Sequence, residues 1–139
     1  MQKSYLVDIG LIVMHYLPWL SVIRDHLSCV ANDYGYEYVF SRYLEAHGRP
    51  GDSLLAISTS GTSKNVVTAA IAARNRGINV ISLSGKMDSQ LGKLANIDIC
   101  TPGGTYADRT QELHIKVIHI LIELVERRLF PENYARRDE

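Results

Sequence analysis

The sequence predicts an α/β fold in which helices cover both faces of a parallel sheet. From Gly51 onward, short apolar runs alternate with longer segments of helical periodicity. Parallel strands need such crossover segments between them, and helices cover sheets of this kind on both faces. The chain has 139 residues, 46% of them hydrophobic, and a chain of that size buries roughly two thirds of its unfolded surface. We therefore expect one three-layer α/β/α domain with its own core.

The first strand of this parallel series is predicted at Leu54–Ile57, between the turn-like residues 49–52 and a loop rich in hydroxyl groups, residues 58–63. A helix over 64–76 follows, and its many alanines would let it lie close to a sheet. Gly77 stands where helices are commonly capped at the C-terminus. The remaining elements are expected as strands at 79–83 and 97–100, a short helix at 89–95 and a long helix from about 106 to 128.

Upstream of residue 50 the pattern is less regular. Residues Glu37–Ala46 are expected to form a helix, and Trp19–Ile23 a strand. The segment before Trp19 fits either a strand or a helix. Asp8 and Gly10 interrupt its apolar run, so it is predicted to be neither a signal peptide nor a membrane span.

Charge and cysteine content disfavour several classes of protein. The 15 Lys and Arg balance the 15 Asp and Glu, whereas nucleic-acid and acidic-membrane binders concentrate positive charge. Two small basic clusters, Arg127-Arg128 and Arg136-Arg137, are expected to be solvated surface. Cys29 and Cys100 lie far apart and outside any zinc-finger spacing, which is typical of buried, reduced thiols in a cytosolic protein.

The loop at residues 58–63 is the strongest candidate for a binding site. Four of the hydroxyl side chains there, between a strand end and a helix start, are the candidate ligands: Ser58, Thr59, Ser60 and Ser63. A helix N-terminus carries about half a positive charge, and hydroxyl groups donate to phosphate oxygens. The pattern favours a site for a small phosphorylated metabolite and no nucleotide cofactor, since the sequence lacks GxxxxGK and GxGxxG. A polar turn with a helix N-cap is the alternative interpretation.

The long helix predicted at 106–128 is apolar around most of its circumference. One face carries Gln111, Ile115 and Ile118, and only a narrow stripe is polar. Such a helix must be covered on more than one side, which favours a homo-oligomer. Gln111 and His119 lie about 80° apart around the helix axis, so both can border one cavity. For His119, a core histidine bonded to a backbone carbonyl is the alternative to proton transfer or metal binding.

Five segments, taken in order, are similar to a known family. They are residues 29–36 (CVANDYGY), 40–42 (FSR), 51–52 (GD), 57–63 (ISTSGTS) and 106–119 (YADRTQELHIKVIH). Together they resemble the sugar isomerase (SIS) domain family, and within it the bacterial phosphoheptose isomerases. The resemblance implies a flavodoxin-like SIS domain at residues 28–130, between a divergent segment 1–27 and a polar tail 131–139.

The resemblance implies a cytoplasmic enzyme, usually a tetramer, that converts D-sedoheptulose 7-phosphate to D-glycero-D-manno-heptose 7-phosphate. In the family this step leads toward ADP-heptose for the lipopolysaccharide core. Many members carry zinc, so zinc is the cofactor that the resemblance implies. The expected partners are a phosphorylated sugar and other copies of the chain, with neither nucleic acid nor a membrane.

The resemblance also gives a role to individual residues. Asn32 and Asp33 would contact the sugar, and Ser58, Thr59, Ser60 and Ser63 would hold the phosphate. Gln111 and His119 would lie at the reacting carbons, where the family also places zinc ligands. His119 would act as one acid/base in proton transfer between C1 and C2 through an enediol.

The N-terminal part departs from the family pattern. Members carry a Gly-Asn-Gly-Gly-Ser loop and then a helix with a catalytic glutamate and a zinc-binding histidine, and residues 1–17 contain no such loop. We therefore expect a shortened or divergent N-terminal part, in which Leu6–Val13 is the candidate for the first strand. The alternatives to an isomerase are a catalytically silent SIS module that binds a sugar phosphate or a partner protein, and an inactive fragment.

Overall fold

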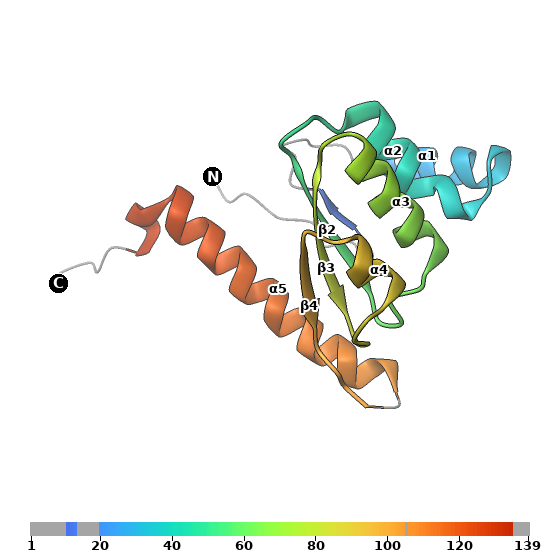
Figure 1. Cartoon of the computed structure of the whole chain (residues 1–139). Helices are drawn as coiled ribbons and strands as arrows, with labels where there is room; N and C mark the ends of the chain where they lie inside the picture. The colour runs from blue at the N-terminus through green and yellow to red at the C-terminus, as the bar shows by residue number, and fades with distance from the viewer. Residues whose placement is uncertain (1–10, 14–19, 105, 135–139) are drawn as a thin grey trace. The chain divides into compact units, whose positions relative to one another are not determined.

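The computed structural model describes residues 11–13, 20–104 and 106–134, with the backbone alone for 11–13 and 20–24. The chain forms two compact units, residues 1–102 and residues 103–139. The elements of the first unit, shown in Figure 1, are β1 (Leu11–Val13), α1 (Leu20–Asp33), the 3-10 helix η1 (Tyr36–Tyr38), α2 (Val39–His47), β2 (Ser53–Ser58), α3 (Lys64–Asn75), β3 (Asn79–Ser84), α4 (Gln90–Leu94) and β4 (Ile97–Cys100). The second unit contains α5 (Ala107–Leu129) and the 3-10 helix η2 (Pro131–Tyr134).

The described strands form one sheet in the order β1-β2-β3-β4. As predicted, β2, β3 and β4 are parallel, with Leu55 opposite Ile81 and Ile81 opposite Ile97. β1 runs antiparallel to β2 at the edge of the sheet, which the sequence pattern did not indicate. It occupies residues 11–13 of the predicted segment 6–13, and residues 6–10 lie outside the described residues.

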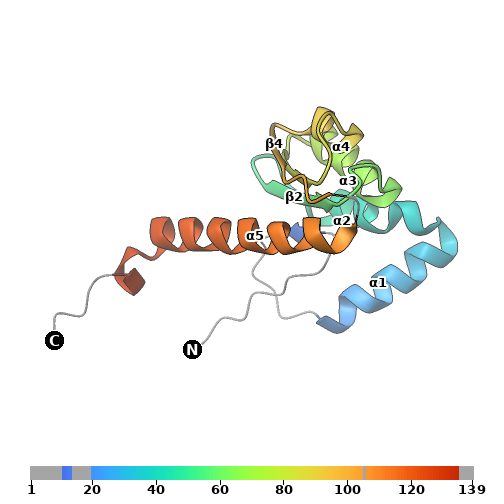
Figure 2. The same cartoon turned by 90° about the horizontal axis from the view of Figure 1, so that it is seen from below.

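Helices α3 and α4 connect the parallel strands and pack against them. Because crossovers between parallel strands are right-handed and the strand order is sequential, both helices lie on the same face of the sheet (Figures 1 and 2). The small side chains of α3 permit this close approach, since Ala69, Ala70 and Ala73 are fully buried. Helix α2 packs on α3 in turn.

The core of the first unit lies between α3 and the sheet face that it covers. On β2, Leu54 and Ala56 are fully buried, whereas Leu55 and Ile57 on the opposite face are half-buried. Each fully buried aliphatic side chain contributes about 1.5–3 kcal/mol. The cluster consists of Leu44, Leu54, Ala56, Val66, Val67, Ala69, Ala70, Ala73, Ile78, Val80 and Leu91. It holds the end of β2 and the start of α3 in fixed positions.

The predicted cap at the C-terminus of α3 is confirmed. Gly77 has a φ of 71°, and its N–H donates to the carbonyl of Arg74 at 3.1 Å. The N–H of Ile78 donates to the carbonyl of Ala73 at 3.0 Å. These two bonds form a Schellman motif, in which a glycine in the left-handed conformation ends the helix.

Two expectations for the first unit are wrong. Leu20–Ile23 begins helix α1 rather than forming a strand, because Ile23, Leu27 and Val30 recur at helical spacing. The cysteines are free, as expected, but they are not both buried: Cys29 is exposed and Cys100 half-buried. The helix predicted at 37–46 is present as η1 followed by α2.

The second unit is a long helix whose end folds back. The Tyr134 hydroxyl donates to Glu126 Oε2 at 2.5 Å, and the guanidinium of Arg127 lies 4.4 Å from the centre of the Tyr134 ring. The hydrogen bond to Glu126 raises the pKa of Tyr134 above its ordinary value of about 10. Among the described helices, none combines the length and apolar character of a membrane span.

Candidate functional site

The hydroxyl-rich loop between β2 and α3, residues 58–63, is called the serine loop below. Ser58 ends β2 and Ser63 precedes the first residue of α3. The structure brings three of its hydroxyl groups together: Ser58 Oγ lies 2.9 Å from Ser63 Oγ and 3.5 Å from Ser60 Oγ. Ser58 is buried, whereas Thr59, Ser60 and Ser63 are half-buried. The cluster therefore consists of one buried hydroxyl group, that of Ser58, and of partly exposed hydroxyl groups that contact it.

Backbone hydrogen bonds hold the serine loop in its conformation. Gly61, with a φ of 65°, donates its N–H to the carbonyl of Ser58 at 3.0 Å and to Ser58 Oγ at 3.1 Å. The β3–α4 segment supports the loop from outside, since the N–H of Leu91 donates to the carbonyl of Gly61 and that of Gly85 to the carbonyl of Thr59, both at 3.0 Å. The loop is thus anchored to the neighbouring crossover at the carboxyl end of the sheet.

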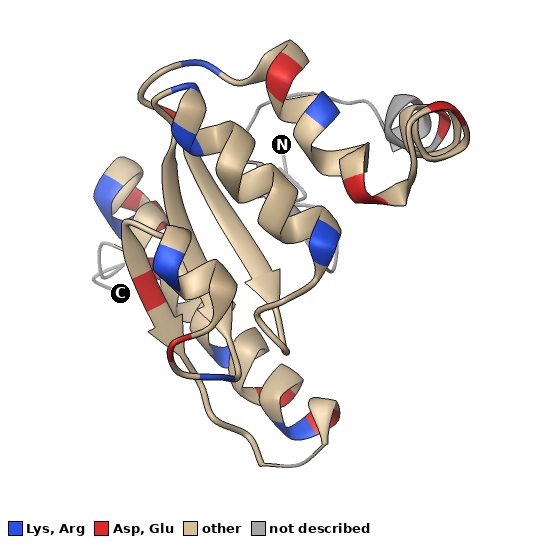
Figure 3. Cartoon of the chain, turned by 45° about the vertical axis from the view of Figure 1, so that its right-hand side comes forward, with Lys and Arg blue, Asp and Glu red and all other residues tan. Residues whose placement is uncertain are grey.

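The N-terminus of α3 adds positive potential at the same place. Ser63 is the N-cap residue, but its hydroxyl makes no capping hydrogen bond and instead contacts Ser58. The first turn of α3 contains no acidic residue, and the charged residues of α3 itself, Lys64 and Arg74, are basic and lie at its two ends (Figure 3). Because anions bind favourably at helix N-termini, the serine loop suits a phosphate group.

Asn32 and Asp33 lie at the C-terminal end of α1. Both are exposed, and Asn32 Nδ2 donates to Asp33 Oδ1 at 2.8 Å. The 3-10 helix η1 begins three residues after Asp33 and contacts α3. The pair therefore stands close in sequence to a segment that packs on the helix of the serine loop, with both side chains accessible to solvent.

Gln111 and His119 belong to the second unit, on α5, and both are exposed. The core-histidine interpretation of His119 is therefore wrong. The buried side chains of α5 are Thr110, His114 and Ile118, so the buried face is displaced from the predicted Gln111–Ile115 line. These three residues are spaced by four, which is the sequence signal for a buried helix face. The signal was missed because two of the three residues are polar.

The described residues do not form a zinc site by themselves. No three His, Cys, Asp or Glu side chains among them come together in a group that could hold a metal ion. Gln111 and His119 supply two donors, whereas zinc sites in proteins have three or four protein ligands.

Comparison with known proteins identifies the family. A sequence model of the SIS domain matches residues 9–85. The chain belongs to the SIS domain family. The match covers β2, α3 and β3, and it therefore includes the whole serine loop. The parallel arrangement of β2, β3 and β4 agrees with the SIS fold that the resemblance implied.

Two curated proteins similar to this chain carry the same name. The phosphoheptose isomerase of Tolumonas auensis is 61% identical over 105 residues, which are 76% of this chain and 55% of that protein. The phosphoheptose isomerase of Glaesserella parasuis is 58% identical over 102 residues, 73% of this chain and 53% of that protein. The chain thus spans about half the length of the curated relatives that it matches.

Solved structures give the same result for the SIS fold. Phosphoheptose isomerase GmhA from Neisseria gonorrhoeae superposes with a TM-score of 0.70 at 36% identity, covering 73% of this chain and 57% of that one. A phosphoheptose isomerase from Francisella tularensis also has a TM-score of 0.70, at 29% identity, covering 75% of this chain and 58% of that one.

Sequence reasoning missed the residues that support the serine loop from α4. Ser89 Oγ accepts the N–H of Gly92 at 3.0 Å as the N-cap of α4, and Ser89 packs against Gly61. A serine just before a short predicted helix was the available signal. Its contact with Gly61, 28 positions away, could not be inferred from local pattern.

Proposed function

We propose that this SIS chain binds the phosphate of a sugar phosphate in its serine loop and serves a phosphoheptose isomerase reaction. The observation that carries the proposal is the cluster of three hydroxyl groups, with Oγ atoms 2.9 and 3.5 Å apart, at the N-terminus of α3. The identity of 61% to a protein named phosphoheptose isomerase supports the choice of sugar.

Hydroxyl groups suit this phosphate because they can rotate. Ser60 and Ser63 each contact Ser58, and both of these half-buried hydroxyl groups can turn their O–H toward a phosphate oxygen without moving the backbone. Hydrogen bonds to a charged group contribute about 1.5–3 kcal/mol each. Remote binding of the phosphate would orient the other end of the sugar for reaction.

The proposed reaction converts D-sedoheptulose 7-phosphate to D-glycero-D-manno-heptose 7-phosphate. A base removes a proton from C1 while O2 gains one, which forms a 1,2-enediol; O1 then loses its proton and C2 gains one. The net change moves two hydrogens and requires neither oxidant nor reductant. We assign one proton transfer to the imidazole of His119 and hydrogen bonding to the sugar oxygens to the amide of Gln111. Within a cell, we place the step in the cytoplasm, on the route to ADP-heptose for lipopolysaccharide core.

We also propose that the chain works as a homo-oligomer, a tetramer by resemblance. Four large side chains of α5 are 44–63% exposed: Ile115, Ile120, Leu124 and Leu129. A groove of about 400 Å³ on the same helix is lined by Leu121, Leu124, Val125, Arg128 and Leu129. A second copy would remove this apolar surface from water. Light scattering on the full chain tests the proposal, and a monomer at micromolar concentration would contradict it.

Turnover of sedoheptulose 7-phosphate by the full chain tests the catalytic part. In D₂O, the product should carry deuterium at C2, because the proton that the base takes from C1 exchanges with solvent before C2 is protonated. His119→Ala should lower kcat by about 10²–10⁴-fold. Lys116→Gln is the matched control, since Lys116 is also exposed on α5, and it should keep the wild-type rate.

Two results would contradict the proposal in different ways. Thermal stabilisation by the sugar phosphate without turnover would indicate a silent SIS module that binds the ligand. Absence of both stabilisation and turnover in the folded chain would refute phosphate binding by the serine loop as well.

A further inference from the structure

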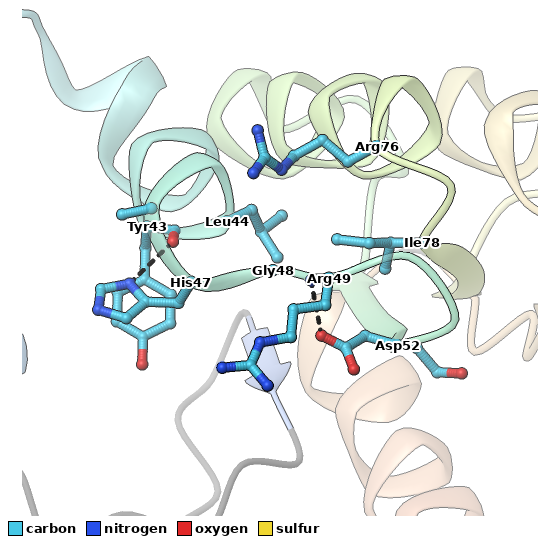
Figure 4. A pocket seen from close by; sticks show the side chains of 10 residues that line it. Tyr43, Leu44, His47, Gly48, Arg49, Asp52, Arg76 and Ile78 are labelled. Atoms are coloured by element: carbon cyan, nitrogen blue, oxygen red, sulfur yellow. Dashed lines mark hydrogen bonds between the residues drawn. The ribbon is translucent and has the colours of Figure 1, made fainter.

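A cavity of about 420 Å³ lies at the amino-terminal edge of the sheet. The segment from α2 to the start of β2 and the end of α3 line it, through Tyr43, Leu44, Ala46, His47, Gly48, Arg49, Asp52, Ser53, Arg76 and Ile78 (Figure 4). The serine loop follows the opposite end of β2, a six-residue strand that spans about 17 Å at the usual rise per residue. The cavity is therefore separate from the proposed phosphate site.

The charged groups around the cavity leave an excess of positive charge. Two guanidinium groups, those of Arg49 and Arg76, line the cavity together with one carboxylate. That carboxylate belongs to Asp52 and accepts the backbone N–H of Arg49 at 2.8 Å. Within the described part of the chain, neither guanidinium takes part in an ion pair. Figure 4 shows both arginine side chains extending toward the side on which Tyr43 and His47 lie.

The walls of the cavity are held rigidly. The His47 ring stacks on Tyr43 with centroids 4.4 Å apart, and its Nδ1 lies 3.1 Å from the Tyr43 carbonyl oxygen. A Cβ on Gly48 would lie 2.5 Å from Ile78 Cδ1, so the chain passes as close to that side chain as a glycine allows. The turn beyond is tied to β3 by the bond from the Asn79 N–H to the Asp52 carbonyl at 2.9 Å.

We propose that this cavity binds a small oxyanion, namely a phosphate or carboxylate group of a metabolite, through the guanidinium groups of Arg49 and Arg76. The guanidinium fork matches the oxygens of both groups through paired hydrogen bonds. The volume falls in the range of small-molecule pockets, about 300–1,000 Å³. The half-buried ring of Tyr43 offers apolar contact to the rest of such a ligand. This site is independent of the sugar phosphate proposed for the serine loop.

Amide proton–nitrogen NMR spectra of the full chain, titrated with inorganic phosphate at constant ionic strength, test the site. Saturable shifts are expected at residues 47–53 and 76–78, separately from any at the serine loop. In the double variant Arg49→Gln/Arg76→Gln, the phosphate affinity measured from the cavity shifts should fall at least tenfold. The affinity measured from the serine-loop shifts should stay unchanged. Both arginines are exposed, and the spectra themselves report whether the variant folds. A parallel titration with citrate distinguishes a carboxylate from a phosphate preference.

Two further variants make the result decisive. Arg76→Lys keeps the charge but loses the fork, and it should bind phosphate with intermediate affinity. Lys93→Gln, an exposed charge on α4 outside the cavity, should bind as the wild type does. Absence of saturable shifts at the cavity, wild-type affinity in the double variant, or equal weakening by Lys93→Gln would each overturn the proposal. Loss of serine-loop binding alone would count against the proposed function and not against this site.

Discussion

Replacing Gly61 by alanine should destabilise the first unit through one identifiable contact. Gly61 is buried in the serine loop with a φ of 65°, a conformation that side-chain-bearing residues rarely adopt. A Cβ at this position would lie 2.5 Å from Ser89 Oγ and closer still to Ser89 Cβ. The Ser89 side chain cannot move away easily, because it accepts the N–H of Gly92 as the N-cap of α4.

The expected cost has two parts that can be separated. The left-handed conformation costs an alanine roughly 1–2 kcal/mol, and the overlap with Ser89 costs roughly 1–3 kcal/mol as overpacking. Gly51 provides the matched control, because its φ is 92° and a Cβ added there would have no other atom within 4 Å. Gly51→Ala should therefore cost about 1–2 kcal/mol, and Gly61→Ala should cost about 2–5 kcal/mol in total.

Urea unfolding followed by far-ultraviolet circular dichroism measures both variants. Ser89→Gly should cost only a few tenths of a kcal/mol, because glycine is a tolerated N-cap. In the double variant Gly61→Ala/Ser89→Gly the overlap is gone, so about 1–3 kcal/mol should be recovered. If the costs of the two substitutions simply add, the collision with Ser89 is not the cause and the reasoning fails.

Two other outcomes concern the serine loop and the end of α5. Ser63→Ala should weaken binding of inorganic phosphate to the serine loop roughly 10–150-fold by calorimetry, through loss of one hydrogen bond to a charged group; unchanged affinity would contradict the geometry. Tyr134 should ionise above its ordinary pKa of about 10 because it donates to Glu126. The contact requires the protonated hydroxyl, so its contribution to stability is fully present below about pH 10 and is lost as the pH rises further. Glu126→Gln should lower that pKa, measured as phenolate absorbance relative to Tyr134→Phe.

The regular part of the fold was predictable because glycines and short loops delimit it. The strand expected at 97–100 occupies those residues, and the one expected at 79–83 extends by a single residue to Ser84. Gly77 separates α3 from β3 through its left-handed conformation, which is a local property that sequence displays directly. The prediction of a strand at Trp19–Ile23 was wrong because a short apolar run fits a buried helix as well as a strand.

The serine loop was predictable for a similar reason, since its hydroxyl groups lie within six consecutive residues. The cationic cavity was not, because Arg49 and Arg76 line one cavity only through the pairing of β2 with β3. Neither arginine stands in a motif, and each alone is typical of a solvated charge. Sites assembled from one loop can thus be found in a single sequence, whereas sites assembled by strand pairing require the tertiary structure.

Helix α5 carries two histidines that differ in exposure. His114 and His119 are five residues apart and lie about 140° from each other around the helix, so a helix that buries one turns the other toward solvent. The structure buries His114, at 4% exposure, and leaves His119 exposed. A buried imidazole is held by packing, whereas an exposed one can meet a substrate and exchange protons with water. Turnover that survives His119→Ala and disappears only when His114 is changed would therefore reverse the assignment of the proton-transfer residue.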